Sequence, residues 1–335
     1  EDMKYPVLKK TPKGAPSTDA SVLEELSKSH ELPKLILKYR EYEKLRSTYI
    51  EGLKNEVVKN RVHTSYNLFG TTTGRLSSEK PNLQNIPNKT DMGQRIREFF
   101  IADSKHVFVI ADYSQIELRV LAHLSNDKSM IDMLQNRESD IHSETASKIF
   151  QTNIESVTKD MRRKAKEVNF GLIYGMESFG LSKSLNISKK EAEELIEAYF
   201  SQFPKIKGFL DKIVDDATTN TFTETLYGRK RYIKELASSN FQLKAMGKRI
   251  AMNAPIQGTA SDIMKIAMIK LNKEIQKIKS TDLLLQIHDE IIIQTPKESA
   301  NKVSKIVKKE MEGASKLKVP LFVDIKENIN LSNLN

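Results

Sequence analysis

The amino-acid sequence predicts an α+β fold, in which one body of strands carries a mostly helical insertion. Three observations support this prediction. An apolar strand is expected at residues 107–111, the stretch from about 128 to 250 is mostly helical in pattern, and strand patterns return in "LLLQIHDEIIIQT" and "VPLFVDIKENINL". Strands on both sides of a helical stretch fit one α+β body better than a doubly wound sheet, in which strands and helices alternate.

Size and charge limit the possible functions. The chain has 335 residues, which is enough for two or three packed subdomains. Hydrophobic residues make up 39% and charged residues 29%, as in a folded globular protein. The formal net charge of +10 favours a polyanionic partner, above all nucleic acid. A generally lysine-rich composition explains the same charge without any such partner.

The missing residue types also exclude some chemistry. Because there is no cysteine, disulfides and thiolate metal sites are excluded, and any metal must be held by oxygen or imidazole. No apolar run approaches the roughly 20 residues of a membrane span. The N-terminal "EDMKYPVLKK" does not have the pattern of a signal peptide. We therefore expect a soluble, cytoplasmic protein.

The first hundred residues predict short elements. After a Pro/Gly/Ser-rich linker, Thr18 or Asp19 can cap a short helix, and a basic amphipathic helix is expected after Pro33. Residues 60–90 are rich in turn formers and predict irregular backbone with short strands. Beyond the strand at 107–111, a helix is expected from about 115 to 125.

The helical stretch has recognisable boundaries. Ser188 followed three residues later by Glu191 has the spacing of a capping box. A long helical pattern covers about 240–279 and contains Pro255, so we expect a break or a kink there.

Two hairpins interrupt or follow the helices. "TETLYGRKRYI" predicts a hairpin with Gly228 in its turn and basic residues at its tip. "LLLQIHDEIIIQT" predicts two buried strands joined by a tight turn at His288 and Asp289, and a last strand follows near the C-terminal end.

Carboxylates stand next to the apolar strands. Asp112 follows the strand at 107–111, while Asp289 lies in the apolar hairpin beside Glu290. If these strands share a sheet, the carboxylates meet at its edge, where mutual repulsion raises a pKa and a divalent cation relieves it. Mg²⁺ favours one or two carboxylates together with substrate phosphate oxygens. The alternative is that Asp112 ends a strand and Asp289 fills a turn without binding a metal.

A basic helix is predicted over "TKDMRRKAKEVNFGLIYG", residues 158–175. Thr158 can cap it, Asp160 suits its first turn and Gly175 can end it. Four residues spaced by four form one stripe, about 18 Å long at 1.5 Å rise per residue: Arg162, Lys166, Phe170 and Tyr174. Two cations followed by two aromatic rings suit the phosphates and the base of a nucleotide. A solvated basic face that runs into a packed apolar end explains the stripe equally simply.

The motifs in their order resemble DNA polymerase family A. "DYSQIEL", "RRKAKEVNFGLIYG" and "HDE" are similar to its three polymerase motifs, and "TTTGRLSSEKPNLQNIPN", "YGRKR" and "NAPIQGTASDIMKIAM" match further parts. The resemblance covers essentially the whole chain. It implies a right-hand polymerase fold with an antiparallel-sheet palm at residues 51–117 and 239–335, helical fingers at 118–238, and only the C-terminal part of the thumb at 1–50. We therefore expect the chain to be part of a longer protein.

The resemblance implies a catalytic and nucleotide-binding set. Asp112 and Asp289, with the backbone carbonyl of Tyr113, match ligands of two Mg²⁺ ions, for which Mn²⁺ can substitute, and Glu290 matches an auxiliary acid. The nucleotide-binding positions that match are Arg162 and Lys166 for the triphosphate, His142 and Gln115 nearby, Phe170 beside the incoming nucleotide, Tyr174 at the templating position and Glu117 as the steric gate. Lys166 also counts as catalytic.

The implied partners are primer–template DNA and deoxynucleotides, without a membrane. The positions that match DNA contacts are Arg75, Asn82, Gln84, Gly175, Arg249, Asn253, Gln257 and His288. Glu177 departs from the family pattern, where a small hydroxyl residue is usual. The implied protein is a monomer that acts on cytoplasmic, nucleoid-associated DNA.

The implied activity is template-directed addition of deoxynucleotides to a primer 3′-OH. A phage-type single-subunit RNA polymerase shares the aspartates and the basic helix, but the combination of Glu117 and Phe170 argues against it. A truncated nucleic-acid-binding module without full activity is the other alternative.

Overall fold

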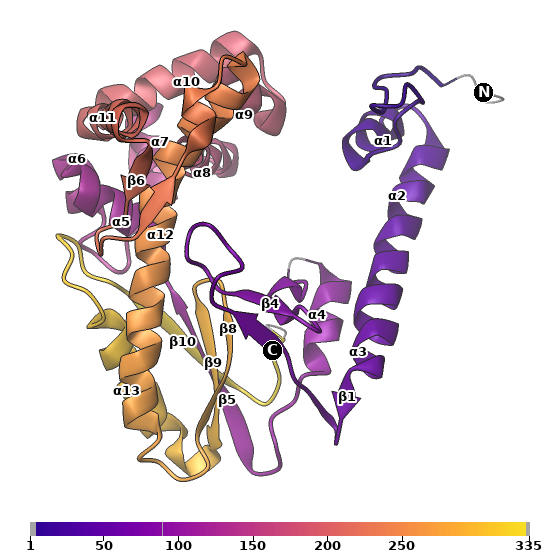
Figure 1. Cartoon of the computed structure of the whole chain (residues 1–335), viewed down its shortest axis with the longest axis vertical. Helices are drawn as coiled ribbons and strands as arrows, with labels where there is room; N and C mark the ends of the chain where they lie inside the picture. Colours follow the sequence, from indigo (N-terminus) through magenta and orange to yellow (C-terminus); the bar gives the residue numbers. More distant parts are fainter. Residues whose placement is uncertain (1–4, 89, 333–335) are drawn as a thin grey trace. The chain divides into compact units, whose positions relative to one another are not determined.

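The computed structural model describes residues 5–88 and 90–332 and shows an α+β protein (Figure 1). The predicted fold class is therefore confirmed. The chain divides into two compact units, one of Glu1–Tyr66 with Ser78–Ile96 and the other of Asn67–Ser77 with Arg97–Asn335. These units do not coincide with the four predicted segments, so the bounds of thumb, palm and fingers stay predictions. Residues 1–4, 89 and 333–335 of those segments lie outside the described residues.

Two helices begin the first unit. α1 (Ala20–Ser27) is capped by Asp19, whose carboxylate accepts from the Val22 N–H at 3.0 Å. Asp19 is one of the two residues predicted as the cap. α2 (Glu31–Lys44) begins before Pro33, contrary to the prediction that it follows this residue. The first four N–H groups of a helix have no partner within it, so proline is tolerated in this first turn. A π-helical segment, η1 (Leu45–Glu51), and α3 (Gly52–Asn55) follow.

Short elements complete this part of the chain, as predicted for residues 60–90. They are β1 (Val57–Val58), β2 (Arg61–Val62), β3 (Ser65–Asn67), β4 (Ser77–Glu79), the 3₁₀ turn η2 (Leu83–Asn85) and α4 (Asp91–Glu98). The boundaries of the two units fall within β3, β4 and α4.

A four-stranded antiparallel sheet is the centre of the second unit. Its order is β10–β5–β9–β8, with β5 (His106–Tyr113) and β9 (Glu290–Pro296) inside and β8 (Asp282–Ile287) and β10 (Val323–Asn328) at the edges. The prediction that the apolar strands share one sheet is confirmed. β5 extends past the predicted end at 111, so Asp112 belongs to the strand itself.

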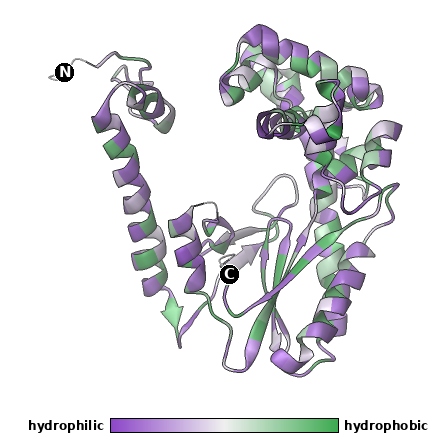
Figure 2. Ribbon diagram, turned by 180° about the vertical axis from the view of Figure 1, so that it is seen from behind, coloured by the Kyte–Doolittle hydropathy of each residue, from purple (hydrophilic) through white to green (hydrophobic). Residues whose placement is uncertain are grey.

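Both faces of this sheet are covered. Alternate residues point to opposite faces of a strand, and in β5 Val109 joins the main core while Phe108 and Ile110 join a second, smaller apolar cluster. Figure 2 shows the resulting hydrophobic colouring along the strands. A strand buried on both faces explains the unbroken apolar run, and it holds the residue at its end firmly.

The mostly helical stretch is also confirmed. It contains α6 (Lys128–Met133), α7 (Ile141–Ile149), η3 (Ile154–Ser156), α8 (Lys159–Ile173), α9 (Ser178–Leu185), α10 (Lys189–Gln202) and α11 (Pro204–Asn220). The separate helix expected at about 115–125 is present before it as α5 (Ile116–Ser125). Ser188 caps α10 by accepting from the Glu191 N–H at 3.1 Å. Only this half of the predicted capping box is present among the described contacts, because the Glu191 carboxylate instead accepts from Lys164 at 2.8 Å.

The predicted basic hairpin is formed by β6 (Phe222–Glu224) and β7 (Lys230–Tyr232). Gly228 has a φ of +82° in its turn, a conformation that favours glycine. The 3₁₀ turn η4 (Lys234–Ala237) leads into α12 (Phe241–Ile275).

α12 is continuous through Pro255, so there is no break at this residue, and the other expected outcome, a kink, stays a prediction. The neighbours Ala251, Ala254 and Ile256 are buried, and their packing offsets the lost hydrogen bond and the crowding that proline causes. The 3₁₀ turn η5 (Lys297–Ser299) and α13 (Ala300–Glu312) complete the unit, and α12 and α13 lie along the sheet (Figure 1). No helix among the described residues, α12 included, is long and apolar enough to cross a membrane.

Candidate active site

The predicted carboxylates meet at one end of the sheet. Asp112 on β5 stands opposite Glu290 on β9 and opposite Asp324 on β10. The backbone N–H of Tyr113 donates to the carbonyl oxygen of Asp289 at 3.1 Å. The adjacency that the sequence could only assume is therefore present in the structure.

The pKa values of the three site acids are raised, chiefly by burial. Burial of the site raises the pKa of Asp112, and the charges of Asp289, Glu290 and Asp324 raise it further, although the Asp112 side chain keeps access to solvent. Burial likewise raises the pKa of Asp289 and of Glu290. Carboxylates held together against this repulsion are stabilised by a bound cation.

The donor set fits a divalent metal shared with a substrate. Across residues 5–88 and 90–332 there is no group of three or more Asp, Glu, His or Cys side chains that could hold a metal by itself. Two carboxylates with the backbone carbonyl of Tyr113 leave coordination positions for phosphate oxygens and water. That incomplete set is what Mg²⁺ in phosphoryl-transfer sites commonly uses.

Glu117 lies in the first turn of α5 and is 6% exposed. Its Oε1 accepts from Arg75 Nη2 at 2.6 Å, and its Oε2 accepts from the Tyr174 hydroxyl at 2.9 Å. Burial raises the pKa of Glu117, which the charge of Arg75 and hydrogen bonds from Tyr174 and Gln257 oppose. Three segments far apart in the sequence therefore converge on this one carboxylate.

The basic stripe lies on α8, as predicted. Thr158 caps the helix by accepting from the Met161 N–H at 3.2 Å. At the other end Gly175 has a φ of +67°, and its N–H and that of Met176 donate to the carbonyls of Leu172 and Gly171. This paired arrangement is a Schellman motif, which ends the helix at the aromatic end of the stripe.

The polar end of the stripe is accessible. Lys166 is exposed, and Arg162 donates from Nε to Asp140 at 2.6 Å. The ring of Phe170 lies against that of His142, with 5.6 Å between the ring centroids. The face is therefore neither wholly solvated nor packed into the core.

His142 does not lie free beside the stripe. It is 3% exposed, with Nδ1 3.2 Å from Asn169 Nδ2 and Nε2 3.4 Å from Gln115 Nε2. The pKa of His142 is lowered to about 4, chiefly by burial and also by the charges of Lys166 and Arg162, while Asp140 opposes the shift. A neutral, buried imidazole fits the support of α7 against α8 better than a cationic phosphate contact.

Two predicted site residues have left-handed backbone. Gln115, just before α5, has a φ of +54°, and His288, in the β8–β9 turn, has a φ of +55°. Residues other than glycine rarely adopt this conformation, and those that do concentrate at functional sites. Both flank the end of the sheet that carries the acids.

The predicted DNA contacts fall into two groups. In the second unit Arg249, Asn253 and Gln257 lie along α12, and Asn253 Nδ2 is buried without a hydrogen-bond partner among the described residues. A Cβ on Gly175 would lie 2.8 Å from Arg249 Cγ, so these two predicted contacts are neighbours. In the first unit Asn82 is exposed and caps η2, whereas the side chain of Gln84 is buried.

Glu177, the departure from the family pattern, is exposed and precedes α9 without a side-chain capping bond. It lines a cavity of about 340 Å³ together with Gly175, Arg249 and apolar side chains that include Phe200 and Met252. Its exposure fits a side chain that faces solvent at the rim of this cavity.

Several polar residues of the site could not be recognised from the sequence. Arg97 lies 3.6 Å from Glu290 with its side chain almost fully buried, Asp140 pairs with Arg162, and Asp324 stands beside Asp112. The alternation of Val, Asp, Ile and Lys in the last strand was the one available signal for Asp324. The other two depend on contacts across the fold.

The comparisons place the chain in a family. The model of DNA polymerase family A matches residues 1–332. The DNA polymerase I of Caldicellulosiruptor bescii is 51% identical over 98% of this chain, that of Geobacillus stearothermophilus 47% over 97%, and the thermostable DNA polymerase I of Thermus aquaticus 45% over 97%. This chain belongs to DNA polymerase family A. It spans 39%, 37% and 39% of the length of those three relatives.

A solved structure agrees with this placement. The POL domain of Pol1 from M. smegmatis, in complex with DNA primer–template and dNTP, superposes with a TM-score of 0.93 at 39% sequence identity. The match covers 98% of this chain and 59% of that one. The predicted polymerase fold and the predicted family are therefore confirmed. The roles of individual site residues stay predictions.

Proposed function

We propose that this chain is the polymerase part of a DNA-directed DNA polymerase, which adds deoxynucleotides to a primer 3′-OH opposite a template strand. One observation carries the proposal. The hydrogen bond between Tyr174 and Glu117 ties the aromatic end of the basic stripe to α5, directly after the strand that carries Asp112. A nucleotide along the stripe would then have its phosphates and sugar beside the carboxylates.

The stripe would hold the incoming nucleotide. Arg162 would exchange Asp140 for phosphate oxygens, which guanidinium groups bind well. Lys166 would neutralise developing phosphate charge and donate a proton to the leaving pyrophosphate. Phe170 would pack against the nucleotide, and Glu117 would occupy the space that a ribose 2′-OH needs.

Asp112, Asp289 and the Tyr113 carbonyl would bind two Mg²⁺ ions, or Mn²⁺ in their place, and these would supply charge stabilisation for the attacking and leaving oxygens. Glu290, held by Arg97, would keep negative charge beside this pair. The sheet fixes the positions of these groups before substrate arrives, which reduces the entropic cost of reaction.

Primer–template DNA would contact α12 and the neighbouring loops. Arg75, Gly175, Arg249, Asn253, Gln257 and His288 are the proposed contacts in the second unit, and Asn82 and Gln84 those in the first. Most protein–DNA hydrogen bonds go to the backbone, so the template base, read by pairing, would select the nucleotide. We place this activity in a monomer on cytoplasmic, nucleoid-associated DNA.

The test compares three single variants of the chain in Mg²⁺-dependent primer extension. Asp112→Asn and Asp289→Asn should each abolish extension and leave binding of primer–template largely intact. Asp324→Asn is the matched control, since this acid stands beside Asp112 on the same sheet end but pairs with Arg137 at 2.9 Å. It should extend primers nearly as the unchanged chain does.

Two results would contradict the proposal. Near-normal extension by Asp112→Asn or Asp289→Asn would remove the metal assignment. DNA binding without any extension by the unchanged chain would favour a nucleic-acid-binding module instead.

A further inference from the structure

The loop that precedes Arg75 is fastened to α12 at one carbonyl. The carbonyl oxygen of Gly74 accepts from Ser261 Oγ at 2.8 Å and from Lys265 Nζ. Ser261 and Lys265 are four positions apart, so they lie on one face of the helix. The next residue after Gly74 is Arg75, whose guanidinium reaches Glu117.

The basic hairpin is bonded to the same stretch of α12. Asp262, which is 6% exposed, accepts at Oδ1 from Arg229 Nε at 2.9 Å and Nη2 at 2.6 Å, and at Oδ2 from Thr225 Oγ1 at 2.8 Å. Thr259 Oγ1 accepts from the Leu226 N–H at 3.0 Å. A buried carboxylate with three such bonds is a rigid anchor.

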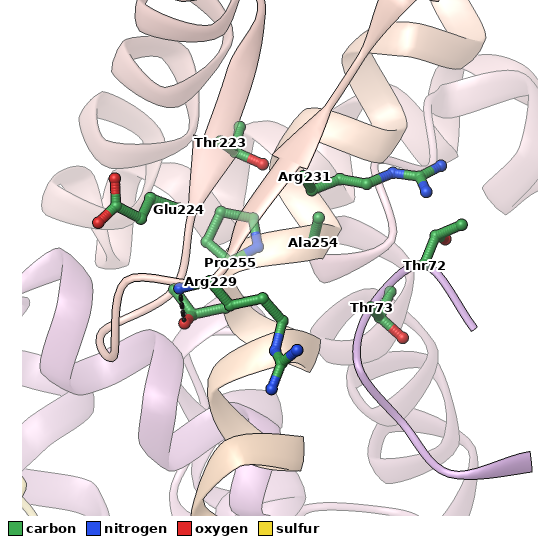
Figure 3. A pocket seen from close by; sticks show the side chains of 9 residues that line it. Thr72, Thr73, Thr223, Glu224, Arg229, Arg231, Ala254 and Pro255 are labelled. Atoms are coloured by element: carbon green, nitrogen blue, oxygen red, sulfur yellow. Dashed lines mark hydrogen bonds between the residues drawn. The ribbon is translucent and has the colours of Figure 1, made fainter. Parts of the chain in front are cut away.

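Hairpin, loop and helix pack closely enough to exclude further atoms. A Cβ on Gly258 would lie 2.6 Å from Thr225 Cγ2 and 3.2 Å from the Thr73 carbonyl oxygen. A Cβ on Gly74, whose φ is +83°, would lie 2.5 Å from Arg229 Nε. Figure 3 shows Thr72 and Thr73 of the loop, Arg229 of the hairpin and Pro255 of α12 around one small pocket.

We propose that Ser261, Asp262 and Lys265 are positioning residues for sugar selection: they fix Gly74 so that Arg75 holds Glu117 in place. This inference rests on the proposed polymerase function. Ser261 and Lys265 act directly on the Gly74 carbonyl, and Asp262 acts through Arg229, which packs against Gly74. The contacts of the three are with the loop and the hairpin, so they would act on the site through other residues.

Movement of the loop should affect sugar selection because of the way Glu117 is held. A buried carboxylate keeps its charge and its rotamer only where donors hold it. For Glu117 these donors include the positively charged Arg75. If the loop moves, Arg75 moves with it, and Glu117 gains freedom to leave the space of the 2′-OH. Ribonucleotides should then be accepted more readily.

The first experiment needs no catalysis. Amide hydrogen exchange is measured in residues 67–77 of the free chain for Lys265→Met, Ser261→Ala and the control Lys270→Met. Lys270 lies on the same helix and also donates to a backbone carbonyl, that of Gly313 at 3.0 Å. Faster exchange in the loop is expected for the first two variants only, because local opening sets exchange rates. Unchanged exchange in both would overturn the proposal.

The second experiment measures kcat/KM for a deoxynucleotide and for its ribonucleotide in primer extension. Lys265→Met should lower the discrimination ratio about tenfold, and Lys265→Arg, which keeps a donor, should restore most of it. In an Arg75→Met background Lys265→Met should change the ratio no further, because neighbours that act through one contact are not additive. A full effect in that background would show that Lys265 does not act through Arg75.

The outcomes separate the two proposals. If the unchanged chain does not extend primers, the polymerase proposal fails, and hydrogen exchange still decides whether the loop depends on Lys265 and Ser261. If extension is normal and the ratio is unchanged in both Lys265→Met and Ser261→Ala, the positioning role is wrong. Where Lys265→Met does not fold, Ser261→Ala removes the other donor and carries the same test.

Discussion

The hydroxyl of Tyr174, at the C-terminal end of α8, donates to the carboxylate of Glu117 in the first turn of α5 over 2.9 Å. The two residues are 57 positions apart in the sequence. The same carboxylate accepts from Arg75 at its other oxygen. The end of the basic helix, the loop of Arg75 and the proposed steric gate are therefore joined through one side chain.

This relationship predicts graded effects on sugar selection. Glu117→Ala should lower the dNTP-to-rNTP ratio of kcat/KM at least tenfold, about 1.4 kcal/mol, because it empties the space at the sugar. Tyr174→Phe keeps the ring and removes one donor to Glu117, so it should lower this ratio less than Glu117→Ala does. Tyr232→Phe removes the hydroxyl of an exposed tyrosine on β7 and serves as the control. Unchanged selectivity in Glu117→Ala would exclude this residue as the gate.

A second prediction concerns stability in mild acid. The pKa of His142 is lowered by burial from 6.5 to about 4 in the folded protein. Between these values the unfolded chain binds more protons than the folded one. The free energy of unfolding is therefore greatest above pH 6.5 and decreases as the pH falls toward 4. The total loss from this residue is about 3 kcal/mol.

Urea unfolding at pH 7 and pH 4.5 of the unchanged chain and of His142→Gln measures this contribution. The variant lacks the titrating group, so its free energy of unfolding should fall less between the two pH values. Equal declines in both proteins would mean that His142 titrates alike in the folded and unfolded states.

Local patterns were predictable from the sequence, and contacts across the fold were not. Asp19, Thr158 and Ser188 cap helices because a cap depends only on the next three residues. The helix does not break at Pro255, because the burial of the flanking residues outweighs the local rule.

The site shows the same division. The apolar strand identified Asp112, since a carboxylate that ends such a run is unusual in itself. Nothing near Glu117 in sequence points to Arg75, 42 positions away, as its partner. Arg97 could not be recognised beside Glu290, since only the folded chain brings α4 close to β9.

A third prediction concerns Asp127, which connects the starts of α6 and α11 by hydrogen bonds. Asp127, which is 2% exposed, caps α6 by accepting from the Met130 N–H at 3.0 Å and also accepts from the Lys205 N–H at the start of α11 at 3.1 Å. Asp127→Ala removes both bonds and leaves the Met130 N–H buried without its acceptor, so it should destabilise the chain by about 3 kcal/mol.

Ser188→Ala is the control for this variant, because it removes a more exposed cap with a single bond and should cost about 1 kcal/mol. Both values come from urea unfolding at pH 7. Equal losses in the two variants would show that the bond to Lys205 adds nothing to the cap.

The fourth prediction distinguishes two lysines on α8. Lys166 lies exposed on the proposed nucleotide stripe, whereas Lys164 points elsewhere and pairs with Glu191 at 2.8 Å. Removing one donor aimed at developing charge typically lowers kcat about 100-fold. Lys166→Gln should therefore lower kcat/KM for the dNTP by about that factor, while the Kd for primer–template changes little. Lys164→Gln removes the same charge from the same helix and should leave kcat/KM nearly unchanged. If both variants lose activity equally, the net charge of α8 matters and the position of Lys166 on the stripe does not.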